Sequence, residues 1–268
     1  MKKILKILPL LIVTIISVIP VYFVVMMSTH STAEIFKGNI MIPGKHLLEN
    51  LKTIIEGGFG LYYWNSFYTS VLSAVLCVVV SSMAGFALTK YNFKLRKKIT
   101  NLILVIMMIP SQISLIGYIV EMKNLGLSNT HLPLIIVWGA NAFGVFFMVQ
   151  YMQKSVPNEV IESARIDGCG EFRIFFQIVI PFIKPALGTL FMLVFLWSWN
   201  NYILQLTLIN DRKLFTIPLG IQALRNAYTQ DWGARGAGLA ASVLPMLLIF
   251  AAGSKTFIKG LTAGAVKG

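Results

Sequence analysis

The run NSFYTSVLSAVLCVVVSSMAGFALT, residues 65–89, contains no acidic, basic or histidine residue. A helix needs about 20 mostly apolar residues to cross the hydrocarbon core of a bilayer, so this run is long enough to span it. Backbone N–H and C=O groups in hydrocarbon need partners within the chain, and a helix supplies them. The run therefore predicts one transmembrane helix.

Five further runs share its length and apolar character. The six predicted spans are residues 4–27, 65–89, 99–121, 132–152, 185–209 and 236–258. Of the 268 residues, 56% are hydrophobic and 12% are charged, with a mean hydropathy of +0.75, whereas soluble domains carry about 25% charged residues. We therefore predict an all-α, multi-pass protein of the cell (inner, cytoplasmic) membrane, with one transmembrane domain over residues 1–268.

The positive charges predict which way the chain crosses the membrane. Fifteen of the 23 Lys and Arg residues fall on the side that holds both termini, the loop 90–98 and the segment 153–184. Because cytoplasmic loops carry an excess of Lys and Arg, both termini are predicted to be cytoplasmic. Topology thus explains the net charge of +13, and nucleic-acid binding is not expected.

Several kinds of functional site are missing from the sequence. The middles of the six spans contain no Asp, Glu, Lys, Arg or His; ion-coupled carriers usually keep such a residue in the bilayer, so that class is the weaker alternative. There is no G-x-x-x-x-G-K-[ST] loop, and we expect a non-catalytic chain that binds no nucleotide. His30, His46 and His131 fall in separate outer loops, so no metal site is expected. Energy for uphill transport would have to come from a partner docked on the cytoplasmic side.

A charged segment between the fourth and fifth spans is the natural place for such docking. It reads IESARIDGCGEFRIFFQIVIP, residues 161–181. Pro157 suits the first position of a helix over 158–167, and Gly168 and Gly170 predict its end. A second short helix, EFRIFFQIVI, is predicted to stop at Pro181. Two short helices around a glycine turn would form a rigid knob at the membrane surface; the alternative is an ordinary interfacial loop with solvated charges.

The same segment carries a specific resemblance. Glu162-Ser163-Ala164, then Gly168, and nine residues later Ile178-Val179-Ile180-Pro181, is similar to the E-A-A–x3–G–x9–I-x-L-P signature of ABC importer permeases. Asp167 before Gly168 resembles the carbohydrate-import type, although Ser163 and Ile180 depart from the pattern. Further matching pieces are MMIP at 107–110, NLGLSNT at 124–130, WSWNNYILQ at 197–205 and GAVKG at 264–268. The resemblance runs from about residue 60 to the end and is closest to the maltose-type second permease subunit.

That resemblance implies a heteromeric importer. Its parts would be this chain, a second permease subunit, two ATP-binding cassette ATPase subunits that hold ATP and Mg²⁺, and an extracytoplasmic sugar-binding protein. Residues 1–60 would form the first span and an outer segment, and 61–268 the permease core with a coupling segment over 155–184. The residues implied in docking on the ATPase are Glu162, Ala164, Asp167, Gly168, Phe172, Phe175 and Pro181. For Phe175 and Phe176, packing against the chain's own spans is the alternative. Permeases of this architecture that carry peptides or polyamines remain a second possibility for the cargo.

Sugar contact would need amides and aromatic faces in a pre-formed cavity. Trp197, Asn200, Asn201 and Gln205 are spaced i, i+3, i+4 and i+8, which predicts one broad face of the fifth span. Asn141 in the fourth span is a further candidate. The alternative is that these amides tie helices together. In the outer loop 210–235, the resemblance implies contact with the binding protein, for which the candidates are Tyr228, Trp232 and Arg235. The alternative is that residues 218–227 form a helix that only covers the spans.

Overall fold

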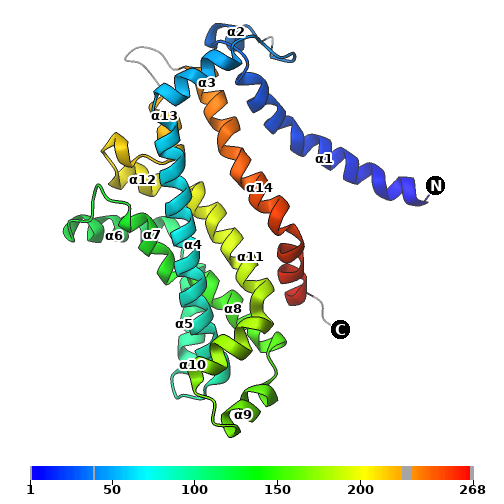
Figure 1. Ribbon diagram of the computed structural model, residues 1–268, viewed down its shortest axis with the longest axis vertical. Coiled ribbons are helices and arrows are strands. Elements are labelled where there is room, and N and C mark those ends of the chain that lie inside the picture. Colours follow the sequence, from blue (N-terminus) through cyan, green and yellow to red (C-terminus); the bar gives the residue numbers. More distant parts are fainter. Residues whose placement is uncertain (1, 39, 225–230, 266–268) are drawn as a thin grey trace. The chain divides into compact units, whose positions relative to one another are not determined.

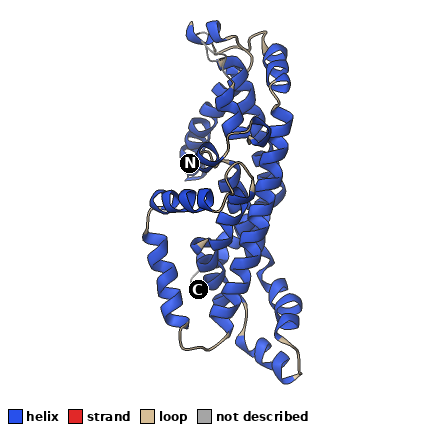
Figure 2. Cartoon of the chain, turned by 90° about the vertical axis from the view of Figure 1, so that its left-hand side faces the viewer, coloured by secondary structure: helices blue, strands red, loops and turns tan. Residues whose placement is uncertain are grey.

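The computed structural model describes residues 2–38, 40–224 and 231–265. Within these ranges every regular element is helical, as predicted (Figures 1 and 2). The chain divides into two compact units: residues 1–65 with 215–247, and residues 66–214 with 248–268. Two long helices, α4 (Phe59–Lys90) and α14 (Trp232–Ala265), contribute to both.

The first unit contains α1 (Lys2–Met27), α2 (Thr32–Phe36), α3 (Leu47–Glu56) and α13 (Ile217–Ala223). The apolar side chains of α1 are largely exposed, as expected of a helix that faces lipid or another subunit. The α3 helix is held by Asn50, whose amide donates to the carbonyls of Ser28 (2.8 Å) and His30 (2.9 Å). A capping box between Ser31 and Glu34 starts α2.

The second unit holds the remaining helices. They are α5 (Arg96–Met108), α6 (Ser111–Asn124), α7 (Leu132–Ile136), α8 (Ala142–Ser155), α9 (Asn158–Ile166), α10 (Glu171–Arg173), α11 (Ile180–Trp199) and α12 (Ile203–Leu208). A π-helical turn over Ile174–Val179 joins α10 to α11. The core of this unit includes fully buried Met148, Ile174, Leu190, Phe195 and Trp199.

In the part of the chain that the structure describes, four helical segments are long and apolar enough to cross a membrane: Ile7–Met27, Phe59–Lys90, Glu171–Trp199 and Trp232–Ala251. Two bent pairs raise the number to six if each pair counts as one span: α5 with α6, bent by 98°, and Leu132–Ala140 with α8, bent by 41°. Each predicted run corresponds to one of these. Pro110 accounts for the sharper bend, because a proline lacks an N–H and holds the preceding residue, Ile109, in an extended conformation (φ −77°, ψ 126°).

The fifth span differs from its prediction at both ends. It begins at Glu171 rather than near residue 185, so EFRIFFQIVI is not a separate short helix that stops at Pro181. The π-helical turn before Pro181 replaces the regular hydrogen-bond ladder where the proline would have broken it. At the other end α11 stops at Trp199, and α12 begins only at Ile203.

Small residues bring α4 and α8 into close contact. A Cβ added at Gly144 would lie 2.5 Å from Ser81 Oγ, and one added at Gly85 would lie 2.8 Å from Met148 Cβ. Helices in membranes use small residues in this way to approach each other and hydroxyls to tie them together. Ser198 of α11 supplies such a tie, since its hydroxyl donates to Ser73 of α4 (3.2 Å).

Candidate functional site

The charged segment forms the predicted amphipathic helix, α9, and nearly at the predicted bounds. Pro157 is the residue before its first turn rather than the first helical residue (φ −62°, ψ 140°). Ile161 and Ala164 are 2% and 6% exposed, so this face packs on the chain, while Glu162 lies exposed on the opposite side. The helix therefore presents a charged face outward from a firmly packed apolar one.

The turn after α9 needs a glycine at one position only. Gly168 has φ +77°, a left-handed conformation that costs other residues energy, whereas Gly170 has an ordinary φ of −69°. The Cys169 N–H donates to Ala164 O (3.0 Å) and the Gly168 N–H to Arg165 O (3.1 Å). These two bonds are those of a Schellman motif, so the sequence correctly predicted a glycine-capped end at Gly168.

The two predicted docking aromatics have different surroundings. Phe175 is 6% exposed and its ring lies 5.4 Å from that of Phe86, which confirms the alternative that it packs against the chain's own helices. Phe172 is 74% exposed. Asp167 and Pro181 are also exposed, the latter at the start of α11.

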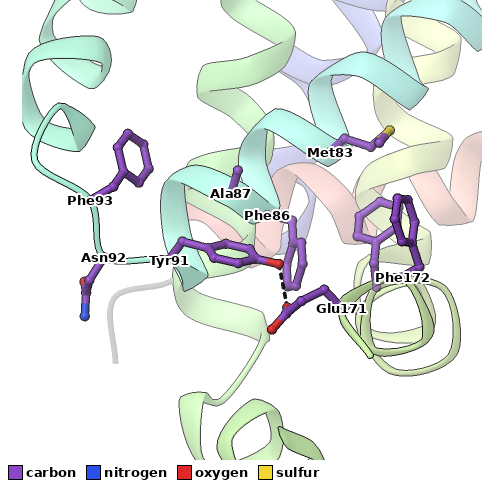
Figure 3. Close-up of a pocket in the computed structure, with 9 residues that line it drawn as sticks. Met83, Phe86, Ala87, Tyr91, Asn92, Phe93, Glu171 and Phe172 are labelled. Carbon is purple, nitrogen blue, oxygen red and sulfur yellow. Dashed lines mark hydrogen bonds between the residues drawn. The ribbon is translucent and has the colours of Figure 1, made fainter. Parts of the chain in front are cut away.

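A pocket of about 410 Å³ opens beside α10. It is lined by Met83, Phe86 and Ala87 from α4, by Tyr91, Asn92 and Phe93 after it, and by Glu171, Phe172 and Phe175 (Figure 3). Its wall is mostly apolar, and its carboxylate, Glu171, accepts a hydrogen bond from the Tyr91 hydroxyl (2.5 Å). The pocket thus adjoins the exposed end of the charged segment.

Glu171 also pairs with Arg165, which lies in the last turn of α9. Arg165 Nε donates to Glu171 Oε1 (2.8 Å), and its guanidinium carbon lies 5.2 Å from the centre of the Tyr91 ring. Burial, and then the hydrogen bond to Glu171, raises the pKa of Tyr91 to about 12. Its bond to Glu171 raises the pKa of Arg165. Sequence reasoning missed Tyr91, because 80 positions separate it from Glu171 and it belongs to no pattern within the charged segment.

Ile166 is a further exposed residue that the sequence reasoning did not select. It is the last residue of α9 and is 86% exposed. Phe176, unlike Phe175, does not follow the alternative of packing against the chain's own spans, since it is 60% exposed. The sequence did carry a signal for Ile166: it is an apolar residue that lies outside the buried face of an amphipathic helix. Together with Phe172, these side chains give the charged segment an apolar, solvent-facing component.

The four polar candidates of the fifth span do not share one helical face, because the helix breaks between Trp199 and Ile203. Asn200 Nδ2 donates to Leu196 O (2.8 Å), and Asn201 Oδ1 accepts from the Leu204 N–H (3.2 Å). Such side-chain bonds to the local backbone compete with the helix and explain its interruption. The prediction of a continuous polar face over 197–205 was therefore wrong.

The remaining path candidates have distinct environments. Trp197 is 40% exposed and stacks on Trp138 with ring centres 6.2 Å apart. Asn141 caps α8, since its Oδ1 accepts from the Gly144 N–H (2.7 Å). Gln205 is 3% exposed, and among the described residues its Oε1 has no hydrogen-bond partner. A buried amide oxygen of this kind is costly to leave unpaired.

Of the three candidates in the outer loop, Tyr228 lies outside the described residues. Arg235 is 8% exposed; its guanidinium donates to Ile221 O (3.3 Å) and to Gln222 Oε1, and lies over the Trp232 ring at 5.2 Å. Within the first unit these residues line a pocket of about 420 Å³. In the described side chains no three His, Cys, Asp or Glu residues gather as metal ligands would.

Comparison with known families identifies the chain. Residues 77–257, more than half of it, match the family described as binding-protein-dependent transport system inner membrane component. The chain belongs to this family. Its members are membrane components of transport systems, which agrees with the four to six candidate spans.

Named relatives and a solved structure support the assignment. The permease is 32% identical over 254 residues to the arabinooligosaccharide transport system permease protein AraQ of Bacillus subtilis (strain 168), covering 93% of this chain and 90% of that protein. It is 31% identical over 249 residues to the lactose transport system permease protein LacG of Rhizobium radiobacter, covering 92% and 90%. A chain from a bacterial ABC transporter that imports the acidic polysaccharide alginate has the same fold (TM-score 0.79, 22% identity, 95% and 97% covered).

Proposed function

We propose that this chain is one permease subunit of an ATP-driven importer for a sugar or oligosaccharide. The observation that carries the proposal is the geometry of α9 and its glycine turn, which present Glu162, Ile166 and Phe172 outward from a firmly packed base. The named cargoes of the relatives, arabinooligosaccharides and lactose, favour a carbohydrate over a peptide or polyamine.

In this proposal the whole chain acts as one permease domain with both termini in the cytoplasm. The family match extends over residues 77–257 and so includes parts of both compact units. The excess of Lys and Arg on the side of the termini supports the orientation. A second permease subunit would complete the pathway, and an extracytoplasmic sugar-binding protein would deliver the cargo.

The coupling segment, residues 155–184, would dock on a partner ATPase that binds ATP and Mg²⁺. Glu162 would pair with a basic residue of that partner and fix the register, because complementary charges orient an interface. Exposed Ile166 and Phe172 would supply apolar contact, since large side chains in fitted pockets carry most binding energy. Ala164 and Phe175, both buried, would support the docking surface from inside, while Asp167, Gly168 and Pro181 would shape its turns.

For the cargo, Trp197 offers an exposed aromatic face and Gln205 an amide oxygen without a partner in this structure. Sugar recognition uses both kinds of group. The three asparagines would not contact the cargo mainly with their side chains, because these bond to local backbone; they would instead fix the helix ends next to the pathway. They are Asn141, Asn200 and Asn201. Tyr228 and Trp232 stay candidates for contact with the binding protein, and Arg235 would support Trp232 through its guanidinium over the ring.

The proposal is tested with the complete transporter in vesicles, by measuring sugar uptake and ATP hydrolysis together. Glu162→Lys should lower binding-protein-stimulated uptake by about tenfold or more, because it places a like charge against the partner. Glu56→Lys, the same change at the exposed last residue of α3, serves as the control. Uptake that persists in cells depleted of ATP but keeping their ion gradients would overturn the proposal and favour an ion-coupled carrier.

A further inference from the structure

We propose that Lys90 and Tyr91, at the cytoplasmic end of α4, are positioning residues that hold both ends of α9 and make α4 follow its movement. This inference rests on the proposed docking of α9 on an ATPase. We call Lys90, Tyr91, Arg165 and Glu171 the α9 clamp.

The first half of the clamp lies at the start of α9. Lys90 Nζ donates to the carbonyl of Val156 (2.6 Å) and to Asn158 Oδ1 (2.7 Å). Val156 is the C-cap residue directly after α8, and Asn158 begins α9. One ammonium group therefore joins the end of α4 to the junction of the other two helices, through hydrogen bonds strengthened by its charge.

The second half lies at the other end of α9. The Tyr91 hydroxyl donates to Glu171 Oε2 (2.5 Å), and Arg165 donates to both oxygens of the same carboxylate (2.8 and 3.2 Å). Arg165 also lies over the Tyr91 ring. The three side chains thus form a closed set across the Gly168 turn, and Figure 3 shows the Tyr91–Glu171 bond beside the pocket.

The closed geometry matters more than the strength of any one bond. The Arg165 and Glu171 side chains are 35% and 41% exposed, and isolated pairs of that kind contribute little to stability. Here, however, each group restrains two others, and linked networks hold positions better than separate pairs. Since α9 is nine residues long, about 14 Å, bonds at both ends prevent it from tilting without straining α4.

The clamp connects α9 to α4 in addition to the covalent chain and to the packed face that holds Ile161 and Ala164. Along the backbone, α9 leads to α11 only through the Gly168 turn and the π-helical turn Ile174–Val179, two places where regular hydrogen bonding is interrupted. By contrast, α4 is one helix from Phe59 to Lys90 with no proline in it. Movement of α9 should therefore reach the membrane more directly through Lys90 and Tyr91 than through the covalent chain.

The test uses the complete transporter in vesicles and measures three quantities: ATPase retained by the purified permease, ATP hydrolysis, and sugar uptake. Tyr91→Phe removes only a hydroxyl, and Lys90→Gln removes the ammonium. Each should lower the uptake per ATP hydrolysed by about threefold or more, as expected for loss of a charge-assisted bond, while the ATPase stays bound. Lys90→Arg, which can donate to the same oxygens, should restore coupling. If Tyr91→Phe does not reach the membrane, Glu171→Gln tests the same hydrogen bond from the acceptor side.

Two matched controls remove similar groups elsewhere. Lys94→Gln takes away an exposed cation four residues later, and Tyr118→Phe removes a hydroxyl that donates to Pro133 O (2.6 Å). Both should couple normally. Unchanged uptake per ATP in Tyr91→Phe, Lys90→Gln and Glu171→Gln would overturn the clamp, as would loss of coupling in the controls to the same degree. If Glu162→Lys leaves ATPase binding and uptake intact, the proposed docking itself fails; if it abolishes ATPase binding while the clamp variants couple normally, only the clamp fails.

Discussion

Replacing Gly168 by alanine should loosen the end of α9 through backbone conformation alone. Gly168 has φ +77°, and a Cβ added there would meet no atom within 4 Å. The cost is therefore the energy of a left-handed residue, about 1–2 kcal/mol. Gly170 is the matched control, because a Cβ there also meets nothing within 4 Å while its φ is −69°.

Hydrogen exchange of the amides in this turn measures the effect directly. The Cys169 and Gly168 N–H groups donate to Ala164 and Arg165 in the native turn. A penalty of about 1–2 kcal/mol should speed their exchange by roughly 5- to 30-fold in Gly168→Ala. Gly168→Asn should show a smaller increase, since asparagine tolerates this conformation better. Equal exchange rates in Gly168→Ala and Gly170→Ala would refute the assignment of the glycine requirement to φ.

Two further predictions concern other parts of the chain. Gly144→Val should destabilise the α4–α8 contact, because its Cβ alone would lie 2.5 Å from Ser81 Oγ. Overpacking of this kind costs about 1–3 kcal/mol of folding free energy. The control is Gly117→Val in α6, where a Cβ meets no atom within 4 Å; a melting temperature of Gly144→Val no lower than that of this control would contradict the prediction. The second is a pH dependence of the α2–α3 segment. The hydrogen bond from the Ser31 N–H lowers the pKa of Glu34 from its ordinary 4.5, and the bond to Glu49 raises the pKa of His46 from 6.5. The Glu34 contribution is present above pH 4.5 and is lost as pH falls through the lowered pKa; the His46 contribution is present below pH 6.5 and is lost as pH rises through the raised one. The protection of the amides in residues 31–38 and 40–49, that is, their exchange rate relative to the intrinsic rate at the same pH, should therefore be greatest between pH 4.5 and pH 6.5, and His46→Gln should remove the loss on the alkaline side.

Patterns that depend only on residues close together in the sequence were predictable. Each of the six apolar runs corresponds to a helix or a bent pair, because length and hydropathy are properties of the run itself. The end of α9 at Gly168 was predictable for the same reason: a left-handed cap is a local demand. The Tyr91–Glu171 bond was not, since it depends on how α4 and α10 pack.

The prolines show why helix breaks were harder to predict than helices. Pro110 separates α5 from α6, whereas Pro185 and Pro245 lie inside continuous helices and Pro181 follows a π-helical turn. All four lack the same N–H donor. The prolines differ in whether the carbonyl groups left without a donor can form other hydrogen bonds. That depends on residues that are close in space but distant in the sequence.

The same reasoning applies to the amides of the fifth span. Spacing alone placed Asn200, Asn201 and Gln205 on one face of a continuous helix, but two of these side chains bond to backbone at the break and so help to end the helix that the spacing assumed. An asparagine at a helix terminus is favoured because its short side chain reaches the local backbone, whereas glutamine reaches further and does not compete in this way. Gln205, buried in α12 with an unpaired Oε1, is therefore the amide in this set whose position its own backbone does not explain. A buried acceptor of this kind is retained at a cost in stability.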